Sequence, residues 1–181
     1  NSGITYVGGD VGTNSGLTTG FNPLLVTGMI HPSPDASTAS AAADLLIVYN
    51  YLNMLPIDIE LLYPAQFGND LVLTPHTYLL NAATMLTGSM YMNAQNNPNA
   101  VFVMHVNGAF TTSTLSKIGL RNGAQAKNIY WLINGAVHVF DNSLFNGNIV
   151  AAGAITLNPG DTLNGRVMTI NGAINISGSY I

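Results

Sequence analysis

The chain contains no cysteine and very little charge. Without cysteine, a disulfide framework is excluded, and only 7% of the 181 residues are Asp, Glu, Lys or Arg, against roughly a quarter in an average protein. The four basic residues, Lys117, Arg121, Lys127 and Arg166, form no cluster, and the net charge is −4. Nucleic acids and anionic membranes attract clustered cations, so we expect neither as a partner.

Long apolar runs are missing as well. No stretch reaches the roughly 20 apolar residues of a membrane-spanning helix, and residues 1–3 show no signal peptide. Hydrophobic residues nevertheless make up 48% of the chain, which excludes disorder and allows one sizeable core. We expect a single domain over residues 1–181, secreted or at the cell surface and without membrane insertion.

A short phrase recurs near the C-terminus. It starts at Asn134, Ala152 and Asn171, and a second phrase keeps the same step from Phe145 to Leu163. A short period of β-forming and turn residues is typical of a solenoid, in which each coil stacks on the last. A coil as long as the interval between these phrases divides into three short strands. We therefore predict a triangular cross-section, with coils about 4.7–4.9 Å apart.

One segment has a different period. Ser33 suits a helix N-cap, Pro34 the first helical position and Asp35 the first turn, and Pro56 ends the pattern. We predict a helix over about residues 34–55 that packs beside the coils through an apolar stripe. The stripe, at spacings of three and four, is Ala41, Leu45, Val48, Leu52 and Leu55.

Several short stretches resemble those of the β-solenoid ice-binding proteins of bacteria, fungi and microalgae, which carry one long α-helix beside the coils. In family order they are residues 9–13, 42–45, 71–75, 86–88, 97–103, 122–126, 128–131 and 164–166. The resemblance implies a right-handed parallel β-solenoid of triangular cross-section with one long α-helix packed alongside. It also implies binding to an ice crystal surface through a flat face, and other modules of the same surface protein as partners.

The resemblance further suggests which residues face ice. The family's ice-facing motif resembles Thr, then Ala or Gly, then any residue, then Thr or Asn. We place this motif at residues 82–85, 114–117, 141–144, 159–162 and 177–180. The step from 114 to 141 is half a coil too long, which predicts an insertion at residues 117–127. The expected ice-contacting residues are Thr84, Thr114, Ser116, Ser143, Leu144, Thr162 and Ser179.

An enzyme is one rival reading, because many parallel β-solenoids act on polysaccharides. Catalysis there needs paired carboxylates or a histidine with partners in a cleft. The acids of this chain are scattered, and its four histidines lack metal-ligand spacing. We expect Asp141 and Asp161 to accept hydrogen bonds at coil corners, and we predict no catalysis, cofactor or metal.

A second rival is a cell-surface adhesion or binding module that attaches to glycans, to cells or to copies of itself. Exposed Met85, Leu144 and Tyr180 in one column would form an apolar patch that suits a protein partner as well as ice. Trp131 and Tyr130 are predicted to pack under the helix or a coil end instead of stacking on sugars. The adhesion module remains the alternative function.

Overall fold

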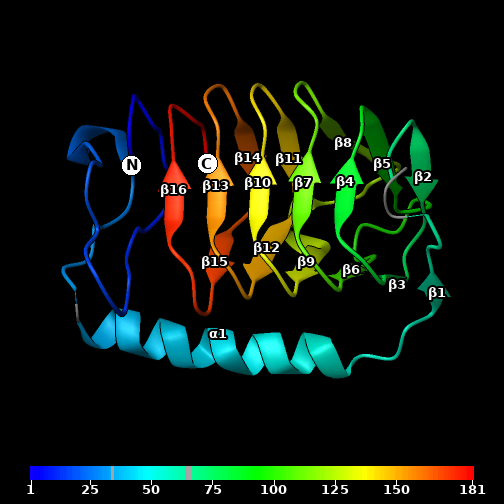
Figure 1. Cartoon of the computed structure of the whole chain (residues 1–181), viewed down its shortest axis with the longest axis horizontal. Helices are drawn as coiled ribbons and strands as arrows, with labels where there is room; N and C mark the ends of the chain where they lie inside the picture. The colour runs from blue at the N-terminus through cyan, green and yellow to red at the C-terminus, as the bar shows by residue number, and fades with distance from the viewer. Residues whose placement is uncertain (34, 64–66) are drawn as a thin grey trace.

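The computed structural model describes residues 1–33, 35–63 and 67–181, which form a stack of coils with a long helix beside it (Figure 1). Each coil contributes strands to three parallel sheets. The helix-side sheet comprises β1 (Ile59–Glu60), β3 (Thr77–Leu80), β6 (Phe102–Val106), β9 (Ile129–Ile133), β12 (Asn148–Ala151) and β15 (Val167–Thr169). The open sheet comprises β4 (Thr84–Leu86), β7 (Phe110–Thr112), β10 (Val137–Val139), β13 (Ile155–Leu157) and β16 (Ile174–Ile176). The third sheet comprises β2 (Leu71–Leu73), β5 (Ser89–Asn93), β8 (Lys117–Arg121), β11 (Leu144–Asn146) and β14 (Thr162–Asn164). The predicted parallel β-solenoid is confirmed.

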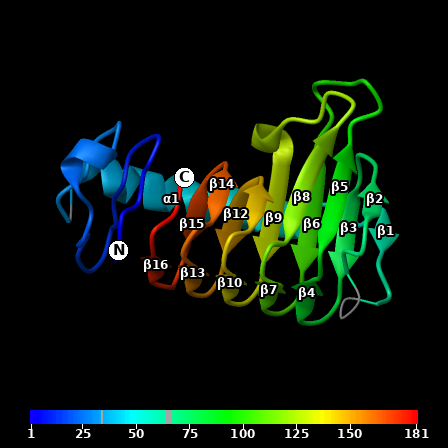
Figure 2. The same ribbon diagram turned by 90° about the horizontal axis from the view of Figure 1, so that it is seen from above.

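The strand register confirms the sequence period. Val137 pairs with Ile155, and Ile155 pairs in turn with Ile174, so each repeat of the phrase is one coil. Lys117 pairs with Leu144, a longer step along the chain, as the predicted insertion requires. The extra residues lengthen β8 and form the loop with the 3-10 helix η3 (Ala126–Asn128). In Figure 2 the loops that follow β5 and β8 extend beyond the rest of the stack.

The helix α1 (Ala36–Met54) begins slightly later than predicted. Its N-cap is Asp35, not Ser33: the Asp35 carboxylate accepts the Thr38 N–H at 2.7 Å, and the Thr38 hydroxyl accepts the Asp35 N–H at 3.1 Å. This reciprocal pair satisfies free donors at the helix start, which is why Asp35 outcompetes Ser33. Pro34 lies outside the described residues.

The packing stripe of α1 is only partly as predicted. Leu45, Leu52 and Leu55 pack against the helix-side sheet, in a cluster that includes Val103, Leu132 and Val150. Ala41 and Val48 are exposed instead. Tyr49 takes part in the packing, and its hydroxyl donates to Asn134 Oδ1 at 2.7 Å. The prediction missed Tyr49 because an apolar pattern does not register a polar-tipped side chain that packs through its ring.

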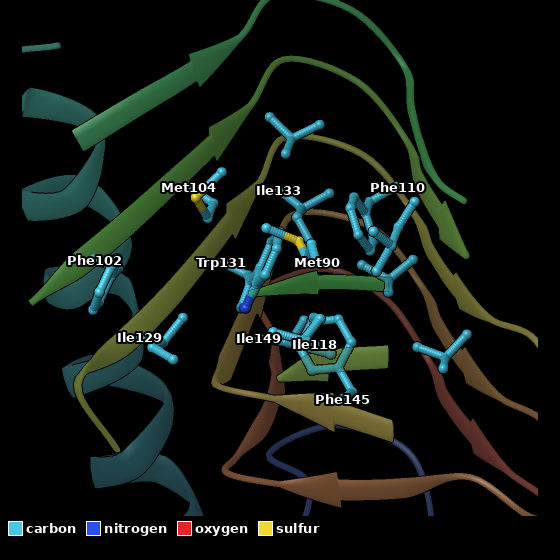
Figure 3. Packing of buried hydrophobic residues seen from close by; sticks show 14 of the residues in the cluster. Met90, Phe102, Met104, Phe110, Ile118, Ile129, Trp131, Ile133, Phe145 and Ile149 are labelled. Carbon is cyan, nitrogen blue, oxygen red and sulfur yellow. The ribbon is translucent and has the colours of Figure 1, made fainter. Parts of the chain in front are cut away.

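Aromatic side chains fill the interior of the coils. The Trp131 ring lies 5.2 Å from both Phe110 and Phe145 between ring centroids, and its indole N–H donates to the Asn146 carbonyl at 3.2 Å (Figure 3). Met90 and Ile118 from the third sheet are also fully buried there. Trp131 is packed, but inside the coils and not under the helix or at a coil end as predicted, whereas Tyr130 packs beside α1 as predicted. The solenoid has a continuous solid core.

The N-terminal segment lies against the last coil of the chain, not the first. Residues 1–30 form bridges from Ser2 to Ser177 and from Tyr6 to Tyr180, and the Gly8 N–H donates to the Ile181 carbonyl at 2.6 Å. The helix α1 then carries the chain along the stack to β1 at the opposite end (Figure 1). Among residues 1–33, 35–63 and 67–181, no helix is both long and apolar enough to cross a bilayer.

Candidate functional site

The open sheet presents the most uniform outer surface of the three. The helix-side sheet is covered by α1. The outer face of the third sheet carries Lys117 and Arg121, and the Arg121 guanidinium lies 3.4 Å from the Tyr91 ring centroid. The outward residues of the open sheet, here called the open face, form three columns that run along the stack.

Each column of the open face follows one position from coil to coil. The alanine column is Ala83, Ala109, Ala136, Ala154 and Ala173. The central column is Met85, Thr111, His138, Thr156 and Asn175. The outer column is Thr87, Ser113, Phe140, Asn158 and Ser177. None of these residues is Asp, Glu, Lys or Arg, so the three columns carry no carboxylate, ammonium or guanidinium group.

Strand alternation and close coil stacking place these columns. Phe110, Val137 and Ile155 point into the core and are 2% exposed or less, so the residues on either side of each point outward. The glycines ahead of the alanines let the coils approach closely. A Cβ at Gly135 would lie 2.6 Å from the Gly108 carbonyl carbon, and one at Gly172 would lie 2.4 Å from the Ala154 nitrogen.

Hydrogen bonds hold His138 in place at the middle of the open face. Its Nε2 lies 2.9 Å from Asn158 Oδ1, and its ring stacks on Phe140 with centroids 4.0 Å apart. The Asn158 amide in turn donates to Asp141, while its backbone N–H donates to Asp161 Oδ2 at 2.9 Å. These contacts restrict the rotamers of His138 and Asn158 and leave the face pre-ordered.

Asp161 anchors the corner behind this part of the face. It is buried, and its carboxylate accepts the backbone N–H groups of Ser143 and Asn158, each at 2.9 Å. Burial raises the pKa of Asp161 to about 6, although both hydrogen bonds act in the opposite direction. The prediction that Asp141 and Asp161 accept hydrogen bonds at coil corners is confirmed. Within the described ranges, no three His, Asp or Glu side chains come together as a metal site would need.

The residues expected to contact ice do not share one surface. Thr84 points inward from β4 and is 3% exposed, and Ser116, Ser143 and Ser179 are buried as well. The Ser116 hydroxyl donates to Ser143 Oγ at 3.0 Å in an internal polar row. For these four residues, the expected place on the outer surface is wrong.

The remaining three expected residues are accessible but lie away from the open face. Thr114 is exposed at the turn between the open and third sheets. Leu144 and Thr162 pair with each other on the third sheet and are half-buried. The predicted column of Met85, Leu144 and Tyr180 is wrong as well, because Met85 lies on the open sheet whereas Tyr180 pairs with Thr162. The seven expected residues therefore belong to the interior, to a corner and to the outer face of a different sheet.

A register error explains the misplacement. Residues 82–85 align with residues 108–111, because Thr84 pairs with Phe110, whereas Lys117 pairs with Ser89 and Leu144. The predicted series of ice-facing motifs joined residues 82–85, which belong to the open sheet, to residues 114–117, which lead into the third sheet. From residue 114 onward the predicted series keeps its register, but it follows the third sheet.

The signal that sequence reasoning missed is the repeated phrase itself. The phrases that start at residues 134, 152 and 171 contain β10, β13 and β16 of the open sheet. At 108–111, 153–156 and 172–175 the sequence reads Gly, Ala, an inward residue, then Thr or Asn. This matches the family's ice-facing motif at every position except the first, where Gly replaces Thr.

Known proteins share this architecture. An ice-binding-like family model matches residues 1–181. An ice-binding protein of Nostoc sp. (strain HG1) is 33% identical over 178 residues, which cover 97% of this chain and 65% of that protein. Ice-binding protein 1 of Shewanella frigidimarina is 29% identical, over 97% of this chain and 21% of its own length. The chain thus spans less than two thirds of these two relatives.

Solved structures agree. An ice-binding protein from an Antarctic bacterium of the Flavobacteriaceae superposes with a TM-score of 0.98 at 54% identity, over 99% of this chain and 43% of that one. An ice-binding protein from the Antarctic ascomycete Antarctomyces psychrotrophicus gives a TM-score of 0.94 at 26% identity, over 99% of this chain and 87% of that one. The chain belongs to the ice-binding-like protein family.

Proposed function

We propose that residues 1–181 form one non-catalytic, extracellular domain that adsorbs to ice through the open face and so inhibits ice growth or recrystallisation. One observation carries this proposal: an unbroken alanine column, one residue ahead of each of five stacked strands, lies beside a column that contains Thr111, Thr156 and Asn175. The relatives described above are named as ice-binding proteins, which supports the same function here.

Ice offers neither a pocket nor a charge, so a protein that binds it needs many weak contacts held in fixed positions. Parallel strands supply such positions at about 4.7–4.9 Å intervals, and a rigid stack loses little conformational entropy on binding. The β-branched side chains of Thr111 and Thr156 are stiff at χ1 and present a methyl group beside a hydroxyl group. The alanine methyl groups leave room for a row of ordered water molecules.

The absence of formal charge among the named columns supports the same reading. Charged side chains hold their hydration water tightly, which would compete with an ice-like water layer. Met85 with Ala83, Ala109 and Thr111 lines a shallow depression on the face, where ordered water can sit between side chains. We propose action outside the cell because the face must reach a growing crystal, with any further modules of a longer protein as partners.

The rival functions gain no such support. The corner hydrogen bonds of Asp141 and Asp161 account for the two acids that a polysaccharide-cleaving enzyme would need. Adhesion to glycans or cells is not named for the relatives reported above. Ice adsorption by the open face therefore accounts for more of the observations than either alternative.

The test is one substitution placed on two sheets. Thr156→Arg puts a bulky cation on the open face, and Thr162→Arg, the matched control, puts it on the outer face of the third sheet. Thermal hysteresis and the shape of a single ice crystal are measured for both, with thermal melting to confirm folding. We expect Thr156→Arg to lose most of the hysteresis, because the cation holds its hydration water and keeps the face away from a flat crystal surface, and we expect Thr162→Arg to keep it. Loss in Thr162→Arg alone would assign ice binding to the third sheet, and an inactive parent protein would reject the function.

A further inference from the structure

Several asparagines of this chain stand directly before a glycine. Asparagine is among the thermolabile residues, and glycine has no Cβ to shield its backbone nitrogen. That nitrogen can therefore attack the amide carbon of the preceding side chain. The six asparagines in this position are Asn107, Asn122, Asn134, Asn146, Asn164 and Asn171. They differ in what holds the side-chain amide.

Two of the six belong to a row of asparagines at the corner between the helix-side sheet and the open sheet. The Asn107 amide donates to Asn81 Oδ1 at 2.9 Å, and the Asn134 amide donates to Asn107 Oδ1 at 3.1 Å. From α1, the Tyr49 hydroxyl donates to Asn134 Oδ1 at 2.7 Å. These bonds fix both side chains and hold the amide group that a reaction would have to expel.

Three more are held by hydrogen bonds elsewhere in the stack. Asn146 is buried, and its amide donates to the Ile118 carbonyl at 2.6 Å. The Asn164 amide donates to Asn146 Oδ1 at 3.0 Å. In the loop after β8, the Asn122 amide donates to Asn93 Oδ1 at 2.8 Å. Each of these amides must break a hydrogen bond before it can react.

Asn171 lacks such support. It is exposed, and among the residues that the structure describes its side chain has no hydrogen-bond partner. The asparagine row does not reach it, because Ala152 follows Asn134 in register at this corner and has no amide to offer. The Asn171 side chain is therefore free to change rotamer.

The turn around Asn171 also keeps the attacking nitrogen within reach of solvent. Residues 170–173 join β15 to β16, whereas the shorter segment 152–154 makes the same turn in the preceding coil. The Gly172 N–H donates to the Thr169 hydroxyl at 3.1 Å in an exposed hydrogen bond. Hydroxide from the solvent can therefore still remove this proton.

We propose that Asn171 is a site of spontaneous deamidation, with water as the co-reactant. The Gly172 nitrogen, after losing its proton, attacks Asn171 Cγ; the N–Cγ bond forms, the Cγ–Nδ2 bond breaks, and ammonia leaves. Water then opens the cyclic imide at either of its two carbonyl groups. One product is an aspartate with the original main chain, and the other is an isoaspartate whose main chain runs through Cβ and Cγ. No atom is oxidised or reduced.

Both products place a carboxylate just ahead of the last strand of the open sheet. Ala173, which follows Gly172, ends the alanine column, and β16 lies next to the N-terminal segment (Figure 1). The coils approach closely here, since a Cβ at Gly172 would lie 2.4 Å from the Ala154 nitrogen. The longer main chain of isoaspartate therefore shifts the end of the column. An effect on ice adsorption rests on the proposed function of the open face, whereas the deamidation itself does not.

The first experiment compares deamidation in the folded protein with deamidation in guanidinium chloride. Samples are kept in mildly alkaline buffer, digested with trypsin and analysed by mass spectrometry. Cleavage after Arg166 and after Arg121 places Asn171 and Asn122 in separate peptides, and fragment spectra resolve the other four sites.

In guanidinium chloride we expect similar rates at all six sites, because each asparagine precedes a glycine. In the folded protein we expect Asn171 to react at least about threefold faster than any other site, since each of the others must first break a hydrogen bond. A folded protein in which another site reacts faster, or in which Asn171 is protected as strongly as Asn122, would overturn the proposal.

The second experiment asks what the modification does. Asn171→Gln lengthens the side chain by one methylene and so disfavours ring closure, and Asn122→Gln is the matched control in the exposed loop after β8. On ageing, the parent and Asn122→Gln should gain an acidic form on ion exchange and lose thermal hysteresis as it accumulates. Asn171→Gln should gain this form at least about threefold more slowly and keep its hysteresis.

The outcomes separate the two proposals. Full hysteresis in a parent protein that is deamidated at Asn171 would reject the effect on adsorption. A freshly prepared parent without hysteresis would reject the proposed function, while the peptide masses would still decide whether Asn171 is modified.

Discussion

The open face and the outer face of the third sheet belong to the same coils but differ in regularity. On the open face, alanine occupies one column immediately before all five strands. On the third sheet, Lys117 lies between Ser89 and Leu144 in register, and the Tyr91 ring covers Gly119 so closely that a Cβ there would lie 2.6 Å from it. A repeating backbone therefore does not impose a repeating surface.

The difference shows where this chain tolerates irregularity. The insertion that lengthens β8 and leads to η3 lies beside the third sheet, and the open sheet keeps short three-residue strands throughout. Arg121, the last residue of β8, lies over the Tyr91 ring beside this insertion. A surface that must match a lattice cannot accept such changes, whereas a surface without that constraint can. This contrast is the basis of the following predictions.

The largest effect is expected from filling the alanine column. Ala154→Tyr adds a ring in the middle of the open face that holds the neighbouring columns away from a flat crystal surface. We expect most of the thermal hysteresis to be lost, with the melting temperature nearly unchanged because the side chain at residue 154 points outward. Val72→Tyr is the control, since Val72 is exposed on the third sheet, and it should retain activity. Equal activity in both variants would remove the distinction between the two faces.

A smaller effect is expected from loosening the middle of the open face. Asn158→Ala removes the side-chain hydrogen bonds to His138 and Asp141 and frees the imidazole to change rotamer. Each lost hydrogen bond is worth about 0.5–1 kcal/mol, so we expect a partial loss of hysteresis, smaller than that of Ala154→Tyr. The double variant Asn158→Ala with His138→Thr places a stiff β-branched side chain in the central column, and should recover the loss. If the single variant shows full activity, the pre-ordering of His138 is irrelevant to adsorption.

The sequence predicts the fold well because a solenoid repeats its local pattern. The coil-to-coil step, the insertion after residue 117 and the buried Trp131 all follow from local spacing and composition. The contact between residues 1–30 and the last coil could not be predicted in this way. It is a pairing between segments far apart in sequence, and no local pattern specifies it.

The candidate face was harder to predict because it depends on register to within one residue. Thr84 and Met85 are adjacent, yet one points into the core and the other to solvent, since side chains alternate along a strand. Ser116 and Ser143 are of a residue type usually found on the surface, but their hydroxyl groups hydrogen-bond to each other inside the stack. The pairing of Thr84 with Phe110 shows that residues 82–85 belong with the repeated phrase of the open sheet and not with residues 114–117.

The smallest effect concerns the corner that both faces share, and it changes stability without changing the open face. Burial raises the pKa of Asp161 to about 6 in the folded protein, against about 3.9 in an unfolded chain. The folded state therefore holds this proton more tightly, and the resulting stability is complete below about pH 4 and is lost as the pH rises through about 6. We expect it to contribute about 2 kcal/mol less to the free energy of unfolding at pH 7 than at pH 4.5.

A comparison with Asp161→Asn isolates this contribution. His105 acts in the opposite direction, because burial lowers its pKa and the unfolded chain then binds a proton first as the pH falls below 6.5. His105 is the same in both proteins, so its effect cancels in the difference between them. Urea unfolding at pH 4.5 and pH 7 should show that the parent's advantage over Asp161→Asn is larger at the lower pH. A difference that stays constant, or that grows toward pH 7, would show that the Asp161 corner is held as an ionised carboxylate. The hydrogen bonds from Ser143 and Asn158 would then outweigh its burial.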